Sequence, residues 1–442
     1  MSGSVDAAAL AEAEAEAGTS GYARGARILS IGIAATGVFT FGYFAVSSHV
    51  LGASDYGAIS TLWAILFVTI SVIYRPVEQL LSRTIADARA RGIHQHELRG
   101  PATIQLTFAG LFLVVALALR GPLTDKAFNG SDALYWILVG ATLAYAGSYF
   151  ARGYLAGHQW FGLYGALVLF ESMSRFCFPV AVAVGIASGQ TAVALGILAA
   201  PLASLLVVPW AIRRHAGGTS GAGATRESAG FAVAVAAIQL AEQTLVTIGV
   251  LLVPDAALRG VVFNALLIAR APLQLFQAIQ TSLLPHLAEI QATEGAGSDV
   301  AIRYTIRGIA AFAGACAIGL LLIGPWVMDV AFGKGYDYGR LGLAAVAVGM
   351  GFHLSAGTLN QAALATGRAA QAARAWLLSA TVFVVWMLLP VVDNRLVRAE
   401  IGYLGAAALL CAQLWWLHRA SRRGVQLGRW RGPSRGSVGE SE

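Results

Sequence analysis

The chain has few charged residues for its length. Only 12% of its 442 residues are Asp, Glu, Lys or Arg, against roughly 25% in soluble domains. A water-soluble fold carries charge over its surface, so this shortage argues against a soluble globular protein. Disordered chains are poor in apolar residues, and the 57% hydrophobic content argues against that class as well.

Cysteine and lysine are also scarce. The three cysteines, Cys177, Cys316 and Cys411, lie inside apolar segments and form no CxxC or Cys/His cluster. They indicate neither a disulfide framework nor a metal site. Arginine supplies nearly all of the positive charge, with 28 Arg against 2 Lys and a net charge of +7. In so apolar a chain this charge indicates retained cytoplasmic loops rather than nucleic-acid binding.

Apolar runs of about 20 residues recur along the whole chain. Such runs cross a hydrocarbon core of ~30 Å as helices. The sequence therefore predicts an all-α polytopic membrane protein with about 12 transmembrane helices. The expected spans cover 27–50, 57–82, 101–119, 133–151, 162–186, 191–212, 229–253, 259–284, 306–331, 340–363, 371–392 and 399–418.

The basic residues orient these spans. With a cytoplasmic N-terminus, 20 of the Arg and Lys residues fall in inside segments and 7 in outside segments. This bias predicts an even number of spans and two cytoplasmic termini. A polar, Gly-rich linker halves the spans. The expected divisions are a tail 1–26, an N-lobe 27–212, a linker 213–228, a C-lobe 229–418 and a basic tail 419–442.

The two halves share a pattern at corresponding positions. IYRPVEQLL (73–81) in the second span resembles IARAPLQLF (268–276) in the eighth. Both place an Arg, a Pro and Gln-Leu in the same order, which favours two six-helix lobes in one orientation. Pro76 and Pro272 would interrupt backbone hydrogen bonds and allow kinks.

Polar residues form stripes inside several spans. Arg270, Gln274 and Gln277 recur at i, i+4 and i+7, which places them on one helical face. A charged group in hydrocarbon costs at least ~2.5–3.5 kcal/mol and usually faces a cavity or a partner. We therefore expect a hydrated cavity between the lobes. Two other spans contribute Arg75, Glu78, Gln79, and Gln239, Glu242, Gln243.

The charged residues of the spans receive different roles. Arg270 has no acidic neighbour within a turn, so we expect it to be a cavity cation for an anionic ligand. Glu171 and Arg175 are i,i+4 neighbours, and we expect a structural intrahelical pair. Glu242 is either a countercharge or a protonatable coupling site. His353 is expected to be a hydrogen-bonded interior residue rather than a proton relay.

Two motifs resemble those of a known family. LG-x-x-x-YG at 51–57 follows the first span, and RGYLAGHQWFGLYG (152–165) follows the fourth. With the run 27–68, they resemble polysaccharide flippases of the Wzx type, within the MOP exporter superfamily. The resemblance implies two lobes that open alternately to each side and move polyprenyl diphosphate oligosaccharides outward. It also implies that Arg75 and Arg270, on cavity-lining spans, hold the diphosphate.

The sequence thus predicts an alternating-access, MATE-like flippase for cell-surface polysaccharide biosynthesis. It has no P-loop, HExxH or complete GxSxG site, so we expect no enzyme and no cofactor. Glu78 and Glu242 would balance the arginines or couple transport to H+ or Na+. Expected partners are the lipid-linked glycan, membrane lipids, a glycan polymerase and glycosyltransferases. Three alternatives stay open: a cation-coupled drug exporter, an uncoupled lipid scramblase, and a non-transporting scaffold for glycan synthesis.

Overall fold

The computed structural model describes residues 31–32, 34–90, 98–209, 226–253, 255–268, 298–333, 335–336, 338–365 and 367–430. This part of the chain is helical and contains no β-strand. Besides helices over 34–50 and Ala256–Ile268, it forms α2 (Ala53–Ile73), α3 (Arg75–Ala90), α4 (Arg99–Ala118), α5 (Arg120–Pro122), a π-helical turn (Leu123–Ala127), α6 (Asp132–Gly157), α7 (Phe161–Ala183), α8 (Gly189–Ser204), a 3-10 turn (Leu205–Val207), α10 (Arg226–Leu251), α12 (Ser298–Phe332), α13 (Arg340–Ala365), α14 (Ala369–Leu388) and α15 (Arg395–Trp430).

Within these described ranges, ten helices are long and apolar enough to cross a membrane. They match the predicted spans two to seven and nine to twelve. The first and eighth predicted spans are described only in part, over 34–50 and Ala256–Ile268. Arg270, Gln274, Gln277 and most of the linker 213–228 lie outside the described residues. The helix α15 continues to Trp430, so part of the predicted C-terminal tail is helical.

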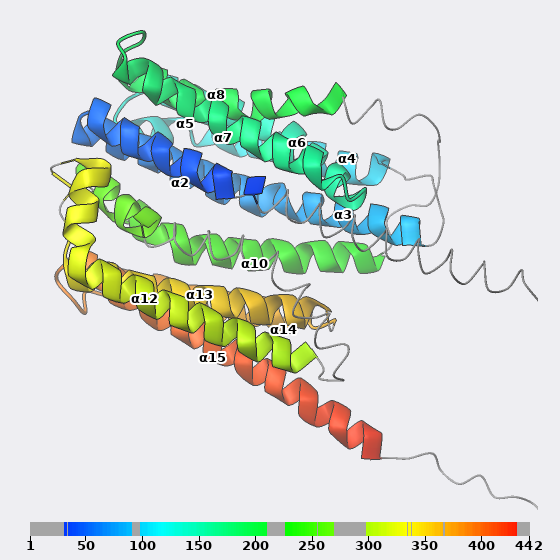
Figure 1. Cartoon of the computed structure of the whole chain (residues 1–442). Helices are drawn as coiled ribbons and strands as arrows, with labels where there is room; N and C mark the ends of the chain where they lie inside the picture. The colour runs from blue at the N-terminus through cyan, green and yellow to red at the C-terminus, as the bar shows by residue number, and fades with distance from the viewer. Residues whose placement is uncertain are drawn as a thin grey trace, which may run out of the picture.

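The helices form two bundles with α10 between them (Figure 1). The first half of the chain, through α8, makes one bundle, and α12 to α15 make the other. The helix α10 packs against α2 and α3 of the first bundle and against α14 of the second.

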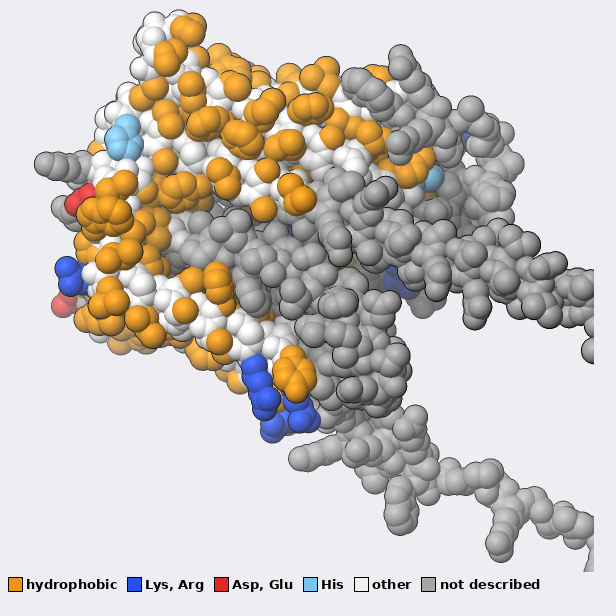
Figure 2. Space-filling view, viewed as in Figure 1, with side chains coloured by type: hydrophobic (Ala, Val, Ile, Leu, Met, Phe, Trp, Pro, Cys, Tyr) orange, Lys and Arg blue, Asp and Glu red, His pale blue; other side chains and the backbone are white. Residues whose placement is uncertain are grey.

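The outer surface of the described helices is largely apolar (Figure 2). Leu106, Ile318 and Trp326 each expose more than half of their surface. Soluble monomers rarely expose continuous apolar areas of this kind, whereas lipid tails solvate them. The surface therefore agrees with a protein embedded in a bilayer.

The second span is interrupted where the sequence predicts a kink. α2 ends at Ile73, Tyr74 forms a turn, and α3 begins at Arg75. Pro76 has no backbone N–H and its ring crowds the carbonyl four residues earlier, so a straight α-helix is disfavoured here. The break places Arg75 at the start of a new helix that faces α10.

The LG-x-x-x-YG motif joins the two bundles at one end. A Cβ atom on Gly57 would lie 1.8 Å from the carbonyl oxygen of Ala256, so only glycine permits this approach. The Tyr56 hydroxyl donates a hydrogen bond to Oδ1 of Asn264, and both side chains are fully buried. The LG-x-x-x-YG motif thus packs α2 against the Ala256–Ile268 helix.

Arg259 reinforces this end of the molecule. Only 8% of its surface is exposed. Its Nε donates to the Val253 carbonyl at 2.8 Å. Its Nη1 lies 3.4 Å from both Thr61 Oγ1 and the Ala127 carbonyl, across the lobe boundary. The Ala256–Ile268 helix begins before the predicted span 259–284, so Arg259 lies in its first turn.

Candidate functional site

We call the helices through α8 the N-lobe and the helices from α10 onward the C-lobe. A cavity of about 270 Å³ lies between these two lobes. Its two walls differ in chemistry. The N-lobe wall holds Arg152, Glu171 and Arg175, whereas the C-lobe wall is almost wholly apolar and has Thr247 as its polar residue. Further lining side chains are Thr36, Thr40, Phe41, Trp63, Phe67, Ile70, Tyr145, Tyr149, Val168, Val246, Val250, Phe263, Leu266 and Leu267.

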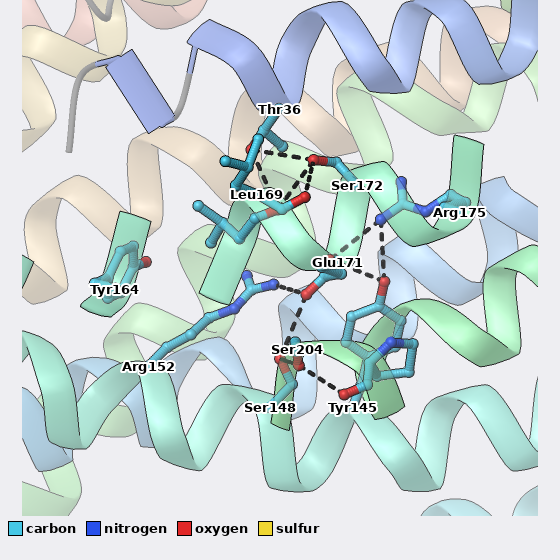
Figure 3. A network of polar contacts seen from close by, with 12 residues as sticks. Thr36, Tyr145, Ser148, Arg152, Tyr164, Leu169, Glu171, Ser172, Arg175 and Ser204 are labelled. Atoms are coloured by element: carbon cyan, nitrogen blue, oxygen red, sulfur yellow. Dashed lines mark hydrogen bonds and ion pairs between the residues drawn. The ribbon is translucent and has the colours of Figure 1, made fainter. Parts of the chain in front are cut away.

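Glu171 is the centre of the polar wall (Figure 3). Its Oε1 accepts hydrogen bonds from Arg175 at 3.1 Å and from the Tyr145 hydroxyl at 3.0 Å. Its Oε2 accepts from Arg152 and, at 3.4 Å, from the Ser148 hydroxyl. Four donors therefore surround one carboxylate that is 7% exposed. The expected i,i+4 contact of Glu171 with Arg175 is present, but it is one part of a larger network.

Both guanidinium groups also lie over aromatic rings. Arg175 is centred 4.3 Å from the Trp63 ring, and Arg152 lies 4.6 Å from the Tyr149 ring. Within the described part of the chain, the Nε atom of each arginine is buried without a hydrogen-bond acceptor. The two arginines thus carry more N–H donors than the Glu171 carboxylate uses.

Arg152 is the site residue that the sequence interpretation missed. The predicted fourth span stopped at 151, so Arg152 was assigned to a loop. α6 instead runs to Gly157, and Gly153 and Gly157 let it approach α3 closely. A Cβ on Gly153 would lie 2.7 Å from the Glu78 carbonyl oxygen. Small residues four apart allow such helix contacts in membranes. The spacing of Tyr145, Ser148 and Arg152 was the available signal.

A second polar branch links the lobes through α3 and α10. Arg75 donates to Gln239 at 3.3 Å, and Gln239 donates to Glu242 at 3.1 Å. Glu242 lies 3.7 Å from Nε2 of His353 on α13. Arg75 and Glu242 therefore belong to one network, in agreement with the countercharge alternative. Neither lines the 270 Å³ cavity as the structure describes it.

The remaining predicted residues have separate environments. Glu78 accepts a hydrogen bond from the Tyr164 hydroxyl at 2.9 Å. Gln79 is half-buried on α3. Gln243 is buried, and its Oε1 has no hydrogen-bond partner among the described residues. No group of three His, Cys, Asp or Glu residues in the described ranges is arranged to hold a metal ion.

Comparison of the sequence with known proteins gives no match. No family model matches the chain. A search of curated proteins also finds no match.

Solved structures do match this fold. An inward-facing multidrug resistance MATE family transporter of the MOP superfamily has a TM-score of 0.62 at 13% identity, covering 92% of this chain and all of that one. The Vibrio cholerae MATE transporter VcmN has a TM-score of 0.59 at 16% identity, covering 92% and 98%. The MATE transporter ClbM in complex with Rb+ has 0.53 at 15%, covering 89% and 94%.

These likenesses show a shared fold. They confirm the predicted all-α polytopic architecture of the MOP type. At identities of 13 to 16% they reach no further than the fold, so the Wzx-type assignment and the substrate stay predictions.

Proposed function

We propose that the chain is a secondary-type membrane transporter that flips an anionic lipid-linked glycan outward by alternating access. The observation that carries this proposal is the pair of arginines in the interlobe cavity. Arg152 and Arg175 line it together with one carboxylate, so the described wall carries one net positive charge. Guanidinium groups bind phosphate oxygens through paired N–H donors.

The other cavity features suit the remaining parts of such a substrate. Trp63, Tyr145 and Tyr149 offer ring faces and hydroxyl groups to a sugar next to the phosphate. The apolar C-lobe wall suits a prenyl chain. A cavity of 270 Å³ holds a headgroup such as a diphosphate sugar rather than a whole glycan. We therefore propose that the lipid tail stays in the bilayer during translocation.

The sequence-based roles of the other polar residues enter here as proposals. Arg75 lies in the neighbouring branch, and we propose that it holds the diphosphate together with Arg270. Glu242, beside His353, is the proposed site of H+ or Na+ coupling. Glycan polymerase and glycosyltransferases remain proposed partners, as does a position in the plasma membrane with cytoplasmic termini.

The main rival is a cation-coupled drug exporter, since two of the structural neighbours are described as MATE transporters and a third as a multidrug one. A cavity that selects a cationic drug by charge carries a net negative charge. Two arginines against one glutamate on the described cavity wall favour an anion instead.

The experiment is lipid mass spectrometry on cells depleted of the protein. We expect polyprenyl diphosphate glycans to accumulate, and to be held in the cytoplasmic leaflet. Complementation with the wild-type chain should clear them, whereas an Arg152→Gln, Arg175→Gln double variant should not. Unchanged glycan lipids, with raised sensitivity to cationic drugs, would contradict the proposal and support the exporter.

A further inference from the structure

We infer that Glu171 is a stand-in for the substrate anion. Its carboxylate neutralises Arg152 and Arg175 while the transporter is empty, and the substrate phosphate displaces it on loading. This inference rests on the proposed function, because it requires an anionic substrate. It adds a role for a residue that the i,i+4 spacing alone assigns to structure.

The donors around Glu171 match the needs of a phosphate. Two guanidinium groups and two hydroxyl groups converge on the carboxylate from α6 and α7. Phosphate oxygens take the same charged and neutral donors as carboxylate oxygens, and they bind guanidinium in the same paired geometry. The arrangement is therefore an anion site that an internal anion already fills.

All four donors belong to the same lobe as Glu171. Arg152, Tyr145 and Ser148 lie on α6, and Arg175 lies on α7. A movement of one lobe against the other leaves these contacts intact. The empty transporter can then return with its arginines paired, whereas two unpaired buried guanidinium groups would impose a large energetic penalty on that step.

The cavity lets a phosphate reach the same groups. Arg152, Glu171, Arg175 and Tyr145 all line it. A phosphate that enters the cavity competes with Glu171 for the guanidinium groups of Arg152 and Arg175. The displaced carboxylate keeps the Tyr145 and Ser148 hydroxyls on α6 as donors. Removing the carboxylate charge should therefore strengthen binding and slow the empty return.

Binding to the purified full chain provides the first test, with farnesyl diphosphate as the probe. We expect Glu171→Gln to lower the Kd about tenfold, since charge-assisted hydrogen bonds to a competing carboxylate are lost. Arg152→Gln should raise the Kd by a similar factor. The matched control is Glu400→Gln, because Glu400 is a carboxyl hydrogen-bonded to Tyr338 in the other lobe. Its Kd should equal that of the wild type.

A second variant guards against a folding defect in Glu171→Gln. Glu171→Asp keeps the charge but withdraws the carboxylate by one methylene, so it should compete less well and bind the probe several-fold more tightly than wild type. Wild-type affinity in both variants, with unfolding midpoints like the wild type, would overturn the inference.

Transport in proteoliposomes provides a readout that a purely structural role would not move. Exchange of labelled for unlabelled farnesyl diphosphate needs only the loaded transporter, whereas net flux needs the empty return. We expect Glu171→Gln to keep exchange and lose most of its net flux. Equal loss of both would contradict the stand-in role. A wild-type chain that binds no farnesyl diphosphate would overturn the proposed function as well, so the two failures are distinguishable.

Discussion

Two of the regions where the lobes meet are built differently. At one end, Tyr56, Gly57 and Arg259 make direct contacts across the boundary, some of them through backbone atoms. At the cavity, the Glu171 network keeps its ion pairs and hydrogen bonds within the N-lobe. The first region holds the lobes together, while the second holds a binding site together.

This difference assigns separate tasks to the two regions. In alternating access the cross-lobe contacts must break and re-form, so they set the balance between conformations. The contacts of Glu171 need not change with that movement. Substitutions at the end held by Tyr56, Gly57 and Arg259, here called the closed end, should therefore alter the distance between the lobes. Substitutions around Glu171 should alter stability and ligand binding. Three variants test this separation.

The largest effect is expected from Gly57→Leu. A side chain at this position would overlap the Ala256 backbone, which cannot move aside as a flexible side chain can. The lobes should separate at this end and transport should be lost. Spin labels at the exposed positions Lys126 and Asp393, in a chain without its native cysteines, would report the distance between the two lobes by pulsed electron paramagnetic resonance.

The control for this variant is Gly110→Leu. Gly110 lies on α4, and a Cβ there meets nothing within 4 Å. It should leave the distance distribution and transport unchanged. An unaltered distribution in Gly57→Leu would contradict the role assigned to the closed end.

A smaller effect, on stability rather than on distance, is expected from Glu171→Ala. The change leaves two buried guanidinium groups without their carboxylate and should cost about 3–5 kcal/mol. Glu242→Ala should cost less, because the Glu242 side chain is 27% exposed. Thermal unfolding followed by tryptophan fluorescence compares the two variants. Equal losses of stability in the two variants, or a changed distance between the lobes in Glu171→Ala, would contradict the separate roles of the two regions.

The smallest effect is expected from Tyr56→Phe. Loss of its hydroxyl breaks the cross-lobe hydrogen bond to Asn264, worth about 1 kcal/mol, which is roughly a fivefold shift between conformations. Tyr43→Phe is the matched variant. Tyr43 is equally buried, but its hydroxyl donates to the Val193 carbonyl at 3.1 Å inside the N-lobe. It should lower stability without shifting the distance distribution.

Much of the architecture was predictable from composition and periodicity. Long apolar runs dictate helices because lipid leaves backbone groups no other partners, and ten such helices are present in the described ranges. The break near Pro76 followed from a single residue. Neither prediction required knowledge of which helices touch.

The candidate site was harder to predict from the sequence, because it depends on contacts between helices. Arg152 was placed in a loop, since hydropathy does not reveal that two glycines extend α6 along α3. The contacts of Arg259 with Thr61 and the Ala127 carbonyl were not predicted, because they depend on how the Ala256–Ile268 helix packs against the N-lobe. Glu171 and Arg175 were paired correctly by spacing, but their position on the cavity wall is a tertiary property.

Flux of a lipid-linked sugar in proteoliposomes tests the central claim most directly. The probe is a polyprenyl diphosphate N-acetylglucosamine, and its exposure on the opposite leaflet is followed with a membrane-impermeant glycan-modifying enzyme. We expect rapid exposure with the wild-type chain and a rate near that of protein-free vesicles with the Arg152→Gln, Arg175→Gln double variant. Equal exposure with and without the wild-type chain would contradict the account.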